Sequence, residues 1–149
     1  MLRRNKTVQR EYEIVDRFEA GIVLTGAEVK SVKKRGIHFE GSFIKLVGNE
    51  ALLLNATVEG YDFSRPENYD PKRSRKLLLH KKELLRIQSK LGQGQNLTIV
   101  PISSYVKKGF VKLEIGIGKG RKMWEIKKVE QSKDERRRVE KELKEYIKT

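Results

Sequence analysis

The chain has 149 residues, a length that suits one compact domain with an appendage rather than several independent cores. It contains no cysteine, which excludes disulfides and thiolate metal sites, and its net charge of +14 at pH 7 favours partners that carry phosphate. The first residues are polar and the apolar runs, such as 51–54 and 77–79, are too short to span a bilayer, so we expect a soluble, cytoplasmic protein.

The first predicted element is a long strand over residues 11–24, bent near its middle. Gly21 interrupts its apolar pattern, which predicts either a bulge or a close approach of the backbone to another segment. A short helix is predicted over 27–34, ending near Gly36.

Two strands are predicted next, over 42–47 and 51–58, joined by a short glycine-containing hairpin loop. The polar stretch 59–74 is predicted to be a loop. A helix follows over 79–91, because its leucines and isoleucine recur on one side and Gly92 can end it.

The last two predicted strands cover 97–105 and 110–117, where valine and isoleucine occupy alternating positions. With five or six strands separated by turns, we predict a mainly β fold: an OB-like antiparallel β-barrel with two or three inserted helices. A two-layer α+β sheet remains an alternative that the pattern does not exclude.

The C-terminal part of the chain has a different character. Residues 105–149 hold 15 lysines and arginines against 8 acidic residues, a net charge of +7. We therefore expect two parts, a barrel over 1–120 and a basic tail over 121–149. A capping-box pattern at Ser132–Glu135 predicts that the tail is helical from about residue 133, with a thin apolar stripe formed by Val139, Leu143, Tyr146 and Ile147.

The clustered positive charge favours nucleic acid as the partner. A merely solubilising surface is the alternative, and a membrane is disfavoured because the chain has no lipidation signal.

No catalytic motif accompanies the charge. His38 and His80 each lack a second histidine at ligand spacing, and the glycine-rich run 116–120 lacks the G-K-[ST] ending of a phosphate-binding loop, so it is better interpreted as the turn where strand becomes tail. We expect no enzymatic activity, cofactor or metal.

Several blocks of the sequence, in order across residues 5–124, resemble the SmpB family, whose members are also called SsrA-binding proteins. They are Asn5-Lys6, Glu11-Tyr12, FEAGI at 18–22, LTGAEVKS at 24–31, DPKRSRKLLLH at 70–80, KKGFVK at 107–112 and GKGRK at 118–122. The resemblance implies an OB-type barrel that binds the transfer-RNA-like part of transfer-messenger RNA (tmRNA). It further implies delivery of that RNA to stalled ribosomes for trans-translation, with the tail in the decoding centre and the empty messenger path. The implied partners are tmRNA and the small ribosomal subunit, and we expect a monomer.

By the same resemblance, four positions are expected to bind RNA: Asn5, Glu19, Leu78 and Lys112. Lys112 would supply a point charge for phosphate, and Glu19 could accept from a base amino group or a ribose hydroxyl. The residues alone suggest simpler roles, namely a surface salt bridge for Glu19, a core position for Leu78 and a turn cap for Asn5. Further candidate RNA contacts are Lys6, Arg73, Arg75, Lys76, Lys107, Lys108 and Lys119; Arg73 and Arg75 would share one side of an extended segment.

The tail residues expected at the decoding centre are Arg121, Lys122, Trp124, Glu125, Lys127 and Lys128. Trp124 occupies the position that stacks on a base in the family, although a lone tryptophan could instead anchor a core. Ile126 replaces a basic residue of the family pattern, and Lys127 replaces an arginine.

The competing hypothesis is a generic OB-fold binder of single-stranded nucleic acid or a ribosome-associated factor. That class usually shows several aromatic residues on the barrel, whereas only 7% of the residues in this chain are aromatic. An enzyme acting on RNA is the third hypothesis.

Overall fold

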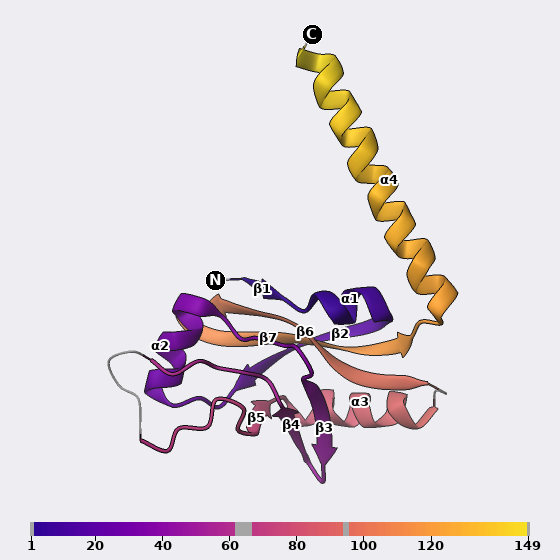
Figure 1. The fold of residues 1–149 in the computed structure, drawn as a ribbon. Coiled ribbons are helices and arrows are strands. Elements are labelled where there is room, and N and C mark those ends of the chain that lie inside the picture. Colours follow the sequence, from indigo (N-terminus) through magenta and orange to yellow (C-terminus); the bar gives the residue numbers. More distant parts are fainter. Residues whose placement is uncertain (1, 62–66, 94–95, 149) are drawn as a thin grey trace.

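A single antiparallel sheet forms the framework of this protein in a computed structural model, which describes residues 2–61, 67–93 and 96–148. The strands lie in the order β1-β6-β7-β2-β5-β4-β3 (Figure 1). The elements are β1 (Arg3–Arg4), α1 (Lys6–Glu11), β2 (Tyr12–Ile22), α2 (Gly26–Arg35), β3 (Phe43–Val47), β4 (Glu50–Leu54), β5 (Arg75–Leu78), α3 (Lys81–Gln93), β6 (Leu97–Lys107), β7 (Phe110–Gly120) and α4 (Met123–Lys148).

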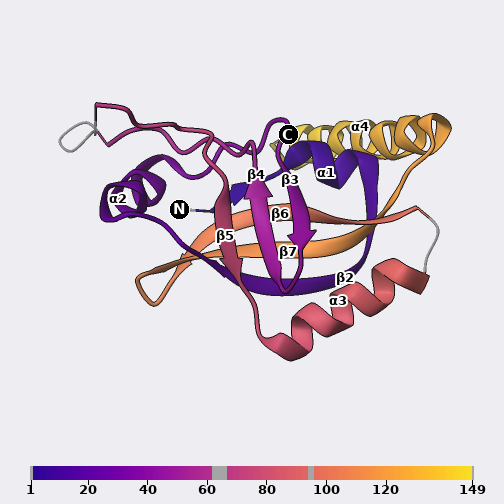
Figure 2. The same cartoon turned by 90° about the horizontal axis from the view of Figure 1, so that it is seen from below.

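The sheet curls into an open, OB-like barrel. The long strands β2, β7 and β6 run side by side, and β5, β4 and β3 cross over them so that β3 approaches β6 (Figure 2). Among the described residues no ladder joins β3 to β6, so the barrel is not fully closed. The predicted mainly β, OB-like architecture is confirmed.

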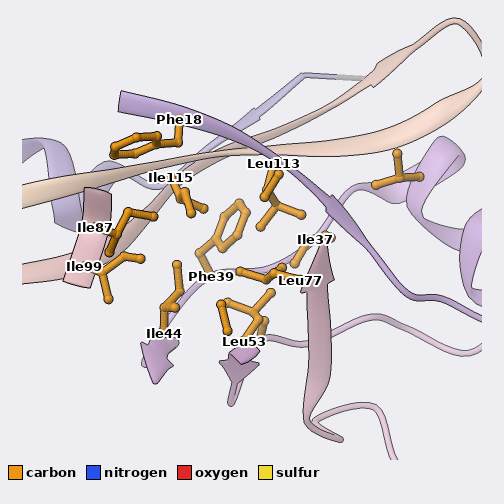
Figure 3. Packing of buried hydrophobic residues seen from close by; sticks show 14 of the residues in the cluster. Phe18, Ile37, Phe39, Ile44, Leu53, Leu77, Ile87, Ile99, Leu113 and Ile115 are labelled. Carbon is orange, nitrogen blue, oxygen red and sulfur yellow. The ribbon is translucent and has the colours of Figure 1, made fainter. Parts of the chain in front are cut away.

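The hydrophobic core lies between the long strands and the crossing strands, and α3 contributes to it. Phe18 of β2, Phe39, Leu53 of β4 and Ile87 of α3 meet there (Figure 3). Side chains alternate between the two faces of β7: Val111, Leu113, Ile115 and Ile117 are buried, while Phe110, Lys112 and Glu114 lie on the other face. This alternation fixes which residues of the long strands can face a ligand.

The bend in β2 lies away from the predicted position. The register shifts between Ile14 and Asp16, whereas the strand runs without interruption through Gly21 to Ile22. Gly21 instead permits a close approach, because a Cβ placed on it would lie 3.2 Å from the Cβ of Leu78. Of the two predicted reasons for this glycine, the close approach is correct and the bulge is wrong.

The glycine-rich run 116–120 is strand rather than turn. β7 continues to Gly120, because the glycines let β2 and β6 pack closely against it. A Cβ on Gly116 would lie 2.7 Å from Cδ1 of Ile102 and 2.8 Å from the carbonyl oxygen of Asp16. The predicted turn at this point is therefore wrong.

Three short elements were not predicted, and some predicted helices and strands end at other residues than expected. β1 and α1 precede most of the first predicted strand, and β5 lies in residues 75–78, between the predicted loop and the predicted helix, where no element was assigned. The predicted strand 51–58 ends at Leu54, because Asn55 adopts a φ of 59° that leaves the strand conformation. The predicted helix over 79–91 is found as α3, and residues 62–66 of the predicted loop 59–74 lie outside the described residues.

The tail helix α4 begins at Met123, well before residue 133. The capping-box pattern at Ser132–Glu135 therefore lies inside a helix and caps nothing. α4 projects away from the sheet (Figure 1), and Val139 and Leu143 of its apolar stripe are exposed. The side chains of Tyr146 and Ile147 lie outside the described residues.

Candidate nucleic-acid interface

The pairing of four neighbouring strands places one residue of each strand in a row across one face of the sheet. Leu78 of β5 pairs with Gly21 of β2, Gly21 pairs with Lys112 of β7, and Lys112 pairs with Tyr105 of β6. Glu19 lies two residues before Gly21, and so on the same face. We call this surface the outer face and define it as Glu19, Gly21, Leu78, Tyr105, Lys107 and Lys112.

Leu78 contributes an apolar patch to the outer face. Its side chain is 52% exposed, whereas that of Leu77 is 3% exposed, because successive residues of β5 point to opposite sides of the sheet. Leu78 packs over Gly21, where a larger residue would displace it. The core position suggested by the residues alone is wrong, and Leu78 is available for a ligand.

Glu19 is held in place by two side chains of β6. The hydroxyl of Tyr105 donates to Oε2 of Glu19 at 2.5 Å, and the ammonium of Lys107 lies 3.5 Å from the carboxylate. The hydrogen bond from Tyr105 lowers the pKa of Glu19 the most. Desolvation raises this pKa in part, and the charges of Lys107 and Lys112 lower it further, so that the pKa lies below its ordinary value. The carboxylate is consequently ionised at neutral pH and can accept hydrogen bonds from a ligand. The surface salt bridge suggested by the residues alone is also present.

Tyr105 is a member of the outer face that sequence reasoning missed. Partial burial raises its pKa, and the hydrogen bond to the Glu19 carboxylate raises it further. The phenol therefore keeps its proton and remains a donor at neutral pH. Its position opposite Lys112 follows from the pairing of β6 with β7, which the sequence signalled only as two adjacent predicted strands.

The lysines that were predicted to contact RNA lie in several separate parts of the structure. Lys107, Lys108 and Lys112 lie at one end of the β6–β7 pair, and Lys76 is exposed on β5, where it pairs with Glu50 at 3.1 Å. Lys6, on α1, and Lys119, near the other end of β7, are exposed elsewhere.

Arg75 is buried rather than exposed to a ligand. Its side chain is fully buried, and its Nη2 and Nε donate to Oε2 of Glu28 at 2.6 and 3.0 Å. Its Nη1 donates to the carbonyl oxygen of Ala56 at 3.1 Å. With its donors engaged inside the protein, Arg75 is a structural residue, and its predicted role as a phosphate contact is wrong.

Arg73 also turns toward Glu28, as the predicted alternation with Arg75 requires. Its Nε lies 3.2 Å from Oε2 of Glu28, and its Nη2 donates to Oε1. The hydroxyl of Tyr69 donates to the same carboxylate at 3.1 Å. Glu28 is thus the centre of a buried network that sequence reasoning missed, because nothing in the local pattern of α2 shows that a charged residue is buried there.

Asn5 is likewise a structural residue in this conformation. It is 5% exposed, its side-chain oxygen accepts from the backbone of Val8 at 3.4 Å, and its amide donates to the carbonyl oxygen of Pro101 at 3.0 Å. These bonds cap α1 and attach it to β6. The expected turn cap is confirmed, and the side chain is not presented to a ligand.

The tail begins beside α1, at the end of the sheet opposite the β6–β7 turn (Figure 2). The backbone N–H of Arg121 donates to the carbonyl oxygen of Glu11 at 2.8 Å, and Arg10 lies 3.6 Å from Glu130 of α4. Trp124 is 63% exposed, so its alternative role as a core anchor is wrong. Helical spacing places Trp124, Lys127 and Lys128 on one side of α4; Lys122 is exposed and Arg121 and Glu125 are half-buried.

Other kinds of site find no support in the described part of the chain. It contains no group of three or more histidine, aspartate or glutamate side chains placed to hold a metal ion. None of its helices combines the length and apolarity needed to cross a membrane.

Comparison with known proteins gives a consistent result. Residues 2–145 match the family described as SmpB protein. The chain is 43% identical over 141 residues to the SsrA-binding protein of Geotalea uraniireducens, covering 95% of this chain and 93% of the relative. It is 40% identical to the SsrA-binding protein of Aquifex aeolicus, covering 94% and 89%.

A solved structure described as "tmRNA-SmpB: a journey to the center of the bacterial ribosome" is also similar. Its TM-score is 0.67 at 39% sequence identity, covering 82% of this chain and 85% of that chain. The family match covers nearly the whole chain, and the structural match, which covers 82% of it, bears the same family name. This chain belongs to the SmpB family.

Proposed function

We propose that this protein binds the transfer-RNA-like domain of tmRNA through the outer face and accompanies that RNA to stalled ribosomes for trans-translation. The observation that carries the proposal is the grouping of Glu19, Leu78 and Lys112 on one exposed surface of a chain that belongs to the SmpB family. The family resemblance implies four RNA-binding positions, of which these three lie together on the outer face while Asn5 is buried.

The chemistry of the outer face suits a folded RNA. Lys112 offers a positive charge for a phosphate, and the ionised Glu19 can accept from a 2′-hydroxyl or a base amino group. Leu78 offers an apolar surface for a ribose or a base. A rigid sheet that carries a donor, an acceptor and an apolar patch at fixed spacing can recognise shape as well as charge.

The tail supplies the proposed ribosomal contact. We assign residues 1–120 to the RNA-binding barrel and 121–149 to a basic tail that enters the decoding centre and the messenger path. Exposed Trp124 would stack on a base there, and Lys127 and Lys128 would contact phosphates. The ribosome would carry out the bond-making steps. Because the protein would act on ribosomes, we expect it to function in the cytoplasm.

Competition binding tests the RNA-binding part of this proposal. The intact protein is titrated with the transfer-RNA-like domain and with an unstructured strand of equal length, at one salt concentration. We expect clear preference for the folded domain, and we expect Lys112→Ala to weaken binding whereas Lys45→Ala, which removes an exposed lysine from β3, leaves it unchanged. Equal affinity for both RNAs would favour a generic single-strand binder, and equal effects of the two variants would show that only overall charge matters.

A further inference from the structure

Phe110 is an exposed aromatic residue at the tip of the β6–β7 hairpin. Its side chain is 70% exposed, and it pairs with Lys107 to close the turn. A single exposed apolar residue needs no explanation by itself. The surroundings of Phe110, and not its exposure alone, point to a ligand.

The turn that carries Phe110 has little conformational freedom. Its two central residues, Lys108 and Gly109, have φ values of 51° and 82°, the left-handed pair that matches the twist of antiparallel strands. The carboxylate of Glu19 also holds Lys107 and Tyr105, which ties the hairpin to β2. The backbone that carries Phe110 is therefore held in a defined position, and the ring projects from it into solvent.

Phe110 lies on the same side of the sheet as the outer face. Along β7 the inward residues Val111 and Leu113 are buried, so Phe110 and Lys112 point the opposite way. The hairpin extends the outer face beyond Leu78 and Glu19, at the end of the sheet remote from α4 (Figure 2). A ligand that covers Lys112 can reach Phe110 without bending around an edge.

The charges around Phe110 select the chemistry of the ligand. Lys107, Lys108 and Lys112 lie within three residues of it along the chain, and no acidic residue lies closer than Glu114 along the chain. An apolar pocket on a protein partner would be disfavoured by these ammonium groups, because burying them is costly. An unpaired nucleotide meets both requirements, since its base stacks on an aromatic ring and its phosphates pair with lysines.

We propose that Phe110 stacks on an unpaired base of the RNA that occupies the outer face, with Lys108 at a neighbouring phosphate. This inference rests on the proposed function and adds to it a contact with a loop or bulge of the RNA, which a continuous duplex could not provide. Phe110 is then a residue that distinguishes a folded RNA with exposed bases from plain double helix.

Variants of the full-length protein test the stacking contact. Phe110→Ala should weaken binding of the transfer-RNA-like domain about tenfold, whereas Phe110→Tyr, which keeps the ring, should stay within about twofold of wild type. Phe43→Ala, which removes a half-exposed ring from β3, is the matched control and should leave the affinity unchanged. The salt dependence of binding should be the same for Phe110→Ala as for wild type, because no charge is lost.

The outcomes separate this inference from the proposed function. If Phe110→Ala binds as tightly as wild type while Lys112→Ala still weakens binding, the stacking contact is wrong and the RNA-binding function stands. If wild type itself shows no preference for the folded RNA, the proposed function fails. Loss of affinity in Phe110→Tyr equal to that in Phe110→Ala would also refute stacking.

An optical measurement does not depend on the stability of the alanine variant. In a Trp124→Phe background, Phe110→Trp places the only tryptophan of the chain at the hairpin tip. Stacking on a base should quench its fluorescence in proportion to the RNA bound. Unchanged emission at saturating RNA would overturn the inference.

Discussion

Glu28 shows how a buried charge can support the outer face, the proposed RNA-binding surface, without touching it. Burial alone would raise the pKa of this carboxyl, but hydrogen bonds from Arg73, from the backbone of Thr25 and from Arg75 outweigh it and lower the pKa to about 2. Because Arg73 and Arg75 lead into β5, the network fixes the start of α2 against the strand that carries Leu78. The position of Leu78 on the outer face depends on this internal ion cluster.

Glu28→Gln should therefore destabilise the fold, by about 3–5 kcal/mol, because it leaves the Arg75 guanidinium buried without its counter-charge. The matched change Glu40→Gln, at an exposed position, should alter the free energy of unfolding by less than about 0.5 kcal/mol. Urea denaturation at pH 7 measures both. Equal stability of the two variants would contradict the role assigned to the network.

Acid should weaken the fold through the same group. The folded-state pKa of Glu28 lies below its ordinary value of 4.5, so its stabilising contribution is complete above that pH and is lost as the pH falls toward about 2. Urea denaturation of wild type between pH 6 and 2 should show this loss, and Glu28→Gln should show a smaller one. Identical pH profiles would contradict the low pKa.

Glu19 and Tyr105 form a second pair, and the role we propose for it is in binding RNA. Glu19→Ala should reduce the preference for the transfer-RNA-like domain over a plain strand, because an acceptor for the RNA is lost. Tyr105→Phe should reduce that preference less, because the carboxylate remains but its hydrogen bond from the phenol is removed. The affinity ratio for the two RNAs is the measurement, and a larger effect of Tyr105→Phe would contradict direct contact by Glu19.

At the scale of elements, the sequence predicts best the helices and strands that have a long periodic pattern or turn residues at their ends. Alternating valines and isoleucines predicted β6 and β7, and Gly36 marked the end of the predicted short helix that is found as α2. β1, α1 and β5 have at most six residues each and are fixed by tertiary contacts, such as the burial of Val8 against β6. β3 and β4 have only five residues each, yet they were predicted, because a glycine-containing hairpin loop marks the turn between them. A short segment without such a turn signal has too few residues for its pattern to indicate an element.

The same limit applied to the candidate site. Which of Leu77 and Leu78 faces outward depends on the pairing of β5 with β2 and β4, which no local pattern specifies. Lys112 and Glu19 were found through family resemblance, while Arg75 was misassigned because an arginine beside other cations suggests a surface. Burial of a charged residue follows from a distant partner, here Glu28, and cannot be predicted from its own neighbours.

α4 should be separable from RNA binding. In the described part of α4, the side chains beyond Ile126 are exposed, and the helix contacts the barrel near α1. A chain that ends after Gly120 should therefore keep nearly full affinity for the transfer-RNA-like domain yet fail to rescue ribosomes stalled on a messenger without a stop codon. The two assays are RNA titration and tagging of the stalled peptide; unaffected tagging would contradict the tail assignment.

At the scale of the whole molecule, the sheet separates two surfaces. β7 has 11 residues and spans about 35 Å between the hairpin of Phe110 and the start of α4. One end of the protein can hold an RNA while the tail engages a different partner. The net charge of +14 assists both encounters by attracting phosphate backbones.

This electrostatic contribution predicts a steep dependence of RNA affinity on salt. If about four phosphates are neutralised, the logarithm of the binding constant should fall with the logarithm of the salt concentration at a slope of about −3 to −4. Lys112→Ala should reduce the magnitude of that slope by about one, because one phosphate contact is lost. A slope near zero would contradict a phosphate-contacting surface.

The most direct test of the central claim is the identity of the RNA bound in the cell. The full-length protein is recovered under native conditions from the cells that encode it, and the copurifying RNA is sequenced and compared with the total RNA. Specific recognition of a folded transfer-RNA-like domain predicts strong enrichment of tmRNA for wild type and weaker enrichment for Lys112→Ala. Recovery of RNAs in proportion to their abundance would contradict it.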